Sequence, residues 1–108
     1  MASLYTDVLL SHSPLVEGNT LDVPCPDGFR MVVTDIDCFT GELAFTTELG
    51  FEDLVTDGTW FAAVTDGILS ASVHLTTRQA FNEGGGFRCN AHRGDWDIRV
   101  TGWLLALP

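Results

Sequence analysis

Two pairs of aspartates, Asp35 with Asp37 and Asp95 with Asp97, have a spacing that could serve calcium binding or acid–base chemistry. Alternate residues of a strand point to the same face, so each pair would place both carboxylates on one side of a sheet. The EF-hand pattern is absent, and a glycosidase needs its two carboxyl groups at a set separation across a cleft. Solvated strand faces carry the same pattern, and we therefore predict that these carboxylates face solvent.

The other reactive side chains form no recognised catalytic pattern. The histidines His12, His74 and His92 are far apart in the chain, and no G-x-S-x-G nucleophile motif occurs. The run Gly84–Gly86 lacks the G-K-[ST] that completes a phosphate-binding loop, and a turn with positive φ explains it better. We predict no catalytic residues, no cofactor and no enzymatic activity.

The cysteines Cys25, Cys38 and Cys89 are odd in number and have no motif spacing. We expect reduced, mostly buried thiols. A zinc site would have to combine Cys38 and Cys89 with His74 and His92, but no C-x-x-C or H-x-x-x-H spacing supports it. We therefore predict no metal site.

Aromatic side chains are better candidates for a binding role. Trp60, Trp96, Trp103 and Tyr5 could line a platform on which sugar rings stack. However, Trp96 and Trp103 fall on opposite parities of one predicted strand, so they cannot share one face. At least one of the two is expected to face a second layer or a partner.

The stretch 84–107 predicts a glycine turn, a short strand, a turn at Arg93-Gly94 and a long closing strand. In the closing strand one parity is apolar and the other polar: Trp96, Ile98, Val100 and Leu104 against Asp97, Arg99 and Thr101. This alternation predicts one buried and one solvated face. From Trp103 onward both parities are apolar, which predicts cover on both sides by a second sheet or a neighbouring subunit. We predict that Trp103, Leu105 and Leu107 form part of a subunit interface.

Shorter alternating runs before this stretch predict strands over 5–10, 19–23, 29–39, 42–48, 59–64 and 68–77. We expect Ser11–Pro14 to end the first strand, and Asp66-Gly67 to form a turn. The run 29–39 changes parity near Val33, which predicts a β-bulge or a strand that passes from one sheet to the other. Gly50–Gly58 gives no clear pattern. We predict one domain, 1–108, with an antiparallel β-sandwich of jelly-roll type and eight to ten short strands.

The chain is strongly acidic, with 15 Asp and Glu against 5 Arg, no Lys and a formal net charge of -10. This charge argues against binding nucleic acid or an anionic membrane surface. No apolar run approaches the length needed to cross a bilayer, and the first residues do not resemble a signal peptide. We expect the protein to be made and kept in a cytoplasm, unless it leaves within a larger assembly.

Several features of the C-terminal third resemble small virion proteins of tailed phages that infect GC-rich actinobacteria. They are Arg78–Phe81, Gly84–Gly86, Phe87–Cys89, Gly94–Val100 and Gly102-Trp103-Leu104-Leu105. The resemblance implies a jelly-roll module on the capsid as a decoration, or in the neck or tail. It also implies a repeating assembly, as a homotrimer or another symmetric oligomer, which contacts other capsid, neck or tail proteins. It supplies no catalytic residues, and it implies a virion that is assembled in the host cytoplasm.

Two alternatives remain from other functional classes. One is a carbohydrate-binding jelly roll, for which a glycan would be the ligand and Trp60 or Trp103 the stacking residue. The other is a small cupin-like metal protein, which would need His and Glu ligands inside the barrel. The predicted polar position of His74 argues against the second alternative.

Overall fold

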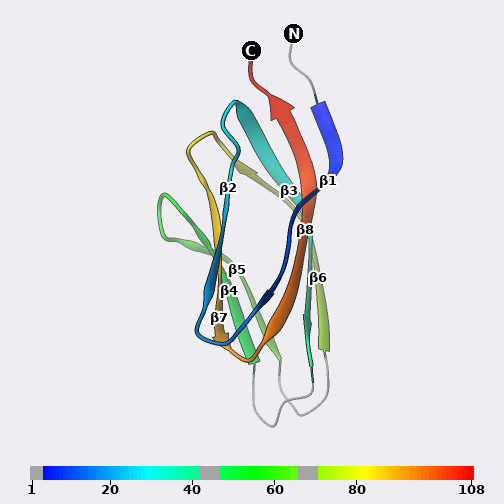
Figure 1. Cartoon of the computed structure of the whole chain (residues 1–108), viewed down its shortest axis with the longest axis vertical. Coiled ribbons are helices and arrows are strands. Elements are labelled where there is room, and N and C mark those ends of the chain that lie inside the picture. Colours follow the sequence, from blue (N-terminus) through cyan, green and yellow to red (C-terminus); the bar gives the residue numbers. More distant parts are fainter. Residues whose placement is uncertain (1–3, 42–46, 66–70) are drawn as a thin grey trace.

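The computed structural model describes residues 4–41, 47–65 and 71–108. Within these ranges, eight strands form two four-stranded antiparallel sheets that pack face to face (Figure 1), with the orders β1-β8-β3-β6 and β2-β7-β4-β5. Their bounds are β1 Leu4–Leu15, β2 Thr20–Pro24, β3 Phe29–Thr40, β4 Thr47–Asp53, β5 Thr59–Thr65, β6 Ala71–Phe81, β7 Gly86–Arg93 and β8 Trp96–Ala106. The predicted all-β jelly-roll sandwich is confirmed.

The core lies between the two sheets and follows the predicted alternation. In β8, Trp96, Ile98 and Val100 are buried, whereas Asp97 and Arg99 are exposed. From the opposite sheet come the inward side chains of β2, β4 and β7, which are Val23, Leu49, Phe51, Phe87, Cys89 and Ala91. Burial of such alternating apolar faces is the main force that holds the two sheets together.

A β-bulge interrupts β3 at Thr34. The pairing of β3 with both β6 and β8 shifts between Val33 and Asp35. Met31 and Val33 point into the core before the bulge, and Ile36 and Cys38 do so after it. The bulge prediction is therefore confirmed, whereas β3 does not pass to the other sheet. The extra residue moves Asp35 and Asp37 to the outer side, as expected.

The first strand is longer than predicted, because Ser11–Pro14 does not end it. Strand β1 continues to Leu15 and pairs with β8 throughout this stretch, with Pro14 opposite Asp97. Proline is tolerated there because β1 is an edge strand, on which one row of backbone groups has no neighbour to bond. His12 is consequently a strand residue that faces outward.

The turns follow glycine as predicted. Gly84, between β6 and β7, has φ of 86°, Gly86 at the start of β7 has φ of 141°, and Gly94, between β7 and β8, has φ of 83°. A Cβ at Gly86 would lie 2.4 Å from the carbonyl oxygen of Val23, so no larger residue fits there. In the unpredicted stretch, β4 continues to Asp53, whose carboxylate accepts hydrogen bonds from the backbone N–H of Val55 and Thr56.

Two predicted features lie largely outside the described residues: most of the 42–48 strand and the Asp66-Gly67 turn. The sandwich measures 52 × 25 × 18 Å, and the start of β1 and the end of β8 lie side by side at one end of its long axis (Figure 1). No helix in the described ranges is long and apolar enough to span a membrane.

Candidate binding face on the outer side of one sheet

The candidate site is the side of the β1-β8-β3-β6 sheet that faces away from the second sheet, here called the outer face. Among its described residues, the charges of arginine and aspartate balance. The described strand residues that point to this side include three arginines and three aspartates, which are Arg30, Arg78, Arg99, Asp35, Asp37 and Asp97. The chain as a whole carries -10 with its histidines neutral, so the excess negative charge resides on other residues. The corresponding side of the other sheet is slightly acidic, with Asp22, Glu48 and Glu52 against Arg88 and Arg93.

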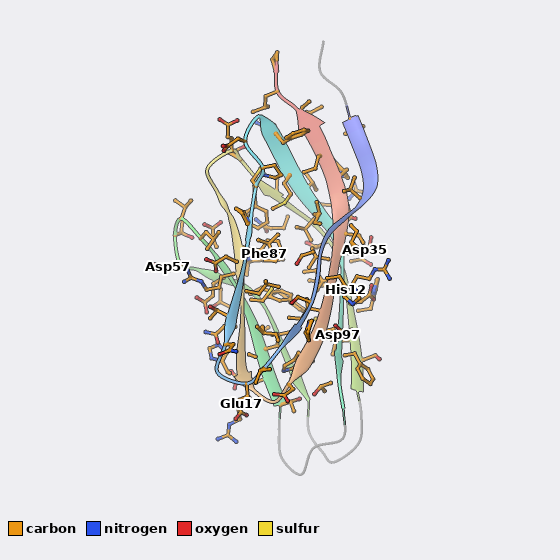
Figure 2. The ribbon with its side chains drawn as sticks, viewed as in Figure 1. His12, Glu17, Asp35, Asp57, Phe87 and Asp97 are labelled. Carbon is orange, nitrogen blue, oxygen red and sulfur yellow. The ribbon has the colours of Figure 1, made fainter. Side chains whose placement is uncertain are left out.

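Four charged or titratable residues form a row straight across the outer face. His12 of β1 lies opposite Arg99 of β8, Arg99 opposite Asp37 of β3, and Asp37 opposite His74 of β6. Together with Asp97, this charged row lines a hollow of about 390 Å³. His12 Nε2 lies 3.3 Å from Asp97 Oδ2, and Figure 2 shows the two side chains beside each other at this sheet. Asp37 lies between Arg99 and His74 in this row, so its carboxylate attracts a cross-strand neighbour on each side.

His74 is held between two carboxylates of β3. Its Nδ1 contacts Asp37 Oδ1, and its Nε2 lies 3.3 Å from Asp35 Oδ1. The hydrogen bond with Asp37 and the charges of both aspartates raise the pKa of His74 above 6.5. The outward position predicted for His74 is confirmed. The two aspartates do share a face, but they hold a histidine that sequence reasoning did not connect with them.

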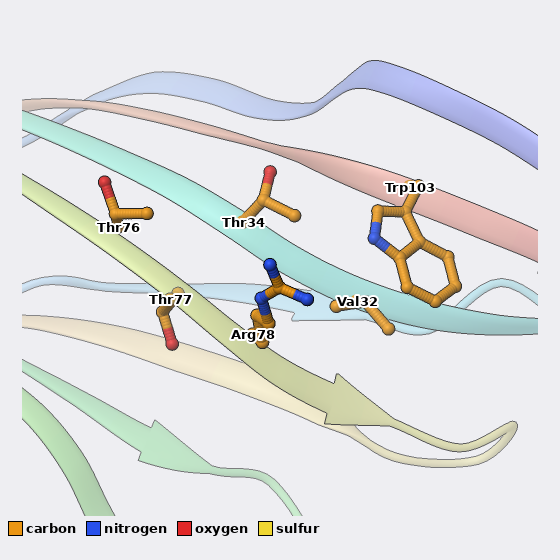
Figure 3. A pocket seen from close by; sticks show the side chains of 6 residues that line it. All are labelled: Val32, Thr34, Thr76, Thr77, Arg78 and Trp103. Carbon is orange, nitrogen blue, oxygen red and sulfur yellow. The ribbon is translucent and has the colours of Figure 1, made fainter.

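A second hollow of about 350 Å³ lies farther along the outer face, and its lining residues are shown in Figure 3. We call it the Trp103 groove; it is lined by Val32, Thr34, Thr76, Thr77, Arg78 and Trp103. Val32 faces this side, directly opposite Trp103, and is only 5% exposed although it is not part of the core cluster. It is therefore buried on the outer face itself, which is unusual for the solvent side of a sheet.

Apolar side chains continue from the Trp103 groove toward the end of β8. Leu105 pairs with Leu4 of β1, and Leu4 is 57% exposed. Leu9, opposite Thr101, is also exposed, and Leu107 is exposed just beyond β8. Trp103 and Leu105 are half-buried, and the second sheet covers only the opposite side of β8, where Leu104 packs on the core. The apolar end of the closing strand was expected to be covered by a second sheet or by a neighbouring subunit. On the outer face, the structure excludes the second sheet.

The structure separates the predicted aromatic platform. Trp60 packs inward against Phe51, Phe81 and Phe87, with ring centroids 5.7–5.9 Å apart. Trp96 is 2% exposed in the core. Trp103 is the one tryptophan on the outer face, so the prediction that Trp96 and Trp103 face opposite ways is confirmed. Trp60 is only partly buried, but its packing against these phenylalanines makes it part of the core edge and not of a platform shared with Trp103.

The candidate zinc ligands are also kept apart. Cys38 points into the core from β3, whereas His74 points outward from β6, so the sheet itself lies between them. Cys25, Cys38 and Cys89 are free and buried, as predicted. Burial raises the pKa of the Cys38 thiol to about 12, with a further contribution from Asp37. Among the described residues, no cluster of three or more His, Cys, Asp or Glu is arranged to hold a metal ion.

No protein-family model matches the chain, and no curated protein resembles it in sequence. Solved structures with a similar course of strands include a viral particle protein of IBDV (TM-score 0.48, 7% identity), of which the match covers 31%, against 99% of this chain. They also include a Bacillus endospore appendage pilus protein (TM-score 0.44, 8% identity, 100% of this chain and 92% of that one). A third is a Cellvibrio mixtus carbohydrate-binding module (TM-score 0.39, 11% identity, 99% of this chain and 87% of that one). At these scores and identities the likeness carries no function with it.

Proposed function

We propose that this chain is a non-enzymatic structural protein of a phage virion, as a capsid decoration or a component of the neck or tail. It uses the outer face of the β1-β8-β3-β6 sheet to bind sister subunits. It also binds a virion surface, either directly or through those subunits. The resemblance of the segment 78–105 to actinobacteriophage virion proteins supports the virion setting. The proposed oligomer is a trimer or another closed ring, assembled in the host cytoplasm.

The observation that carries the association proposal is the combination of balanced charge and exposed apolar side chains on one face. Subunits with a net charge of -10 repel one another through most of their surface. Among the described residues of the outer face, three arginines offset three aspartates, so approach costs less there than over the acidic remainder of the chain. Trp103, Leu105 and Leu4 add apolar area, and tryptophan is enriched in interface cores.

Light scattering after size exclusion tests this proposal. We expect a mass that is a whole multiple of the 11.7 kDa chain, and a return to 11.7 kDa in Trp103→Asp and in Leu105→Asp. Val55→Asp is the matched control, because Val55 is 71% exposed in the β4–β5 turn and gains the same charge away from the outer face. Circular dichroism establishes that each variant remains β-rich. Folded outer-face variants that keep the oligomer would overturn the proposal.

Carbohydrate binding is the second candidate function, and the Trp103 groove favours it. The indole of Trp103 shares one hollow with the hydroxyl-bearing side chains of Thr34 and Thr76. An aromatic face with nearby hydrogen-bonding groups is the arrangement that holds a ring with one apolar side and polar edges. Trp103→Ala should therefore abolish glycan binding, whereas Trp60→Ala should leave it unchanged, because Trp60 packs against the core and lies outside the Trp103 groove.

A further inference from the structure

We propose that the Trp103 groove binds an acidic sugar, that is, a pyranose ring bearing a carboxylate, with Arg78 as the residue that recognises the carboxylate. This inference deepens the second candidate function by naming its ligand class. It does not require that the chain associates with itself.

Arg78 is the first observation behind this proposal. Its guanidinium lines the groove, and no residue in the described ranges forms an ion pair or a hydrogen bond with it. Arg88 on the other sheet behaves differently, because its Nε donates to Asp22 Oδ1 at 2.7 Å. An unpaired guanidinium in a chain with 15 carboxylates retains its full set of donors for a ligand. Its planar fork matches a carboxylate through two parallel hydrogen bonds.

The second observation is the direction in which the hydrogen-bond donors of the groove point. Figure 3 shows the Arg78 guanidinium extending over β3 toward Thr34, with the indole nitrogen of Trp103 on the side of its ring nearest to them. The groove therefore offers an arginine and an indole N–H, both of which only donate. Val32 supplies an apolar floor between these donors. A ligand that complements this set has acceptors at its edge and an apolar face.

The size and chemistry of the groove favour a sugar over the carboxylate side chain of another protein. Its volume of about 350 Å³ is in the range of small-ligand pockets and exceeds what one aspartate or glutamate would fill. Thr34 Oγ1 donates to Asp35 Oδ2, and Thr76 Oγ1 lies 3.3 Å from His74 Nε2, but each oxygen can still accept a hydrogen bond from a ring hydroxyl, which a carboxylate side chain lacks. The balanced charge of the outer face allows an anion to approach despite the acidity of the whole chain.

Titration of the full chain with sodium glucuronate, glucose and sodium acetate, followed by intrinsic tryptophan fluorescence and calorimetry, tests the assignment. We expect a glucuronate Kd in about the millimolar range, as befits an open groove, and at least tenfold weaker binding of glucose and acetate. Arg78→Ala should weaken glucuronate binding about tenfold or more, because a hydrogen bond to a charged group is lost. The glucuronate affinity of Arg78→Lys should lie between that of the parent protein and that of Arg78→Ala. Lysine keeps the positive charge but lacks the planar pair of parallel N–H donors.

Arg99→Ala is the matched control, because it removes the same charge from the same face at the other hollow. Equal binding of glucose and glucuronate would overturn the acidic-sugar assignment and leave the second candidate function standing. Equal binding of acetate and glucuronate, or no binding of any of the three, would overturn both. If Arg78→Ala lost self-association and the protein bound no sugar, the guanidinium would belong to a contact between copies. That result would also overturn the inference. Because light scattering measures self-association without sugar, the assembly proposal stands or falls separately.

Discussion

Trp103 and Val32 lie opposite each other across β8 and β3 on the outer face, and Val32 is almost fully buried there without belonging to the core. A sheet side turned to solvent seldom buries an aliphatic residue. The pair therefore marks a second, smaller apolar site outside the sandwich core. Around it lie the Arg78 guanidinium on one side and Leu105 with Leu4 on the other.

Gly102 allows the close approach of strands at this pair. A Cβ on Gly102 would lie 2.0 Å from the carbonyl oxygen of Val32. We expect Gly102→Ala to lower the free energy of unfolding by about 2–4 kcal/mol, because β3 and β8 would have to separate next to the bulge. Urea denaturation followed by circular dichroism measures this change.

Gly41→Ala is the control for the Gly102 variant, since a Cβ there meets nothing within 4 Å. Its free energy of unfolding should stay within about 0.5 kcal/mol of the parent protein. If the two variants were equally stable, the tight contact between Gly102 and Val32 would not exist in solution.

The pKa of His74 should lie above 6.5 in the folded protein, because its hydrogen bond to Asp37 favours the protonated ring. A folded-state pKa above the unfolded value means that this contribution to stability is fully present below about pH 6.5 and is lost as the pH rises through the folded pKa. NMR titration of the ring protons measures the value directly. Asp37→Asn should lower the pKa of His74. Asp97→Asn should leave that pKa unchanged, because Asp97 pairs with His12 and not with His74.

The native thiols should react slowly with a thiol reagent at neutral pH. Burial raises the pKa values of Cys25, Cys38 and Cys89, that of Cys38 to about 12, so little thiolate forms and little is accessible. A colourimetric thiol assay should detect all three cysteines in denaturant and none within minutes in the native protein. Rapid labelling without denaturant would show that the sandwich opens.

The strand pattern was predictable wherever one parity was apolar, as in β8, and the bulge at Thr34 could be inferred from the change of parity. The first strand was misjudged because a proline on an edge strand needs no partner for its nitrogen, and edge position is a property of the sheet order. The Trp103 groove and the charged row were also missed, because they too depend on the order and register of the strands. Arg78 and Trp103 are far apart in sequence, and only the register through β3 brings them to one surface.

The central claim is that the outer face becomes covered when the chain assembles, and cysteine protection tests it directly. Thr76→Cys places a reactive thiol on the outer face, and Thr20→Cys places one on an exposed position of β2 on the other sheet. The buried native thiols contribute little background. We expect maleimide labelling of Thr76→Cys to slow at least about tenfold from dilute to assembled protein, while Thr20→Cys labels at an unchanged rate. Equal labelling of Thr76→Cys in both states, or protection of Thr20→Cys instead, would contradict the account.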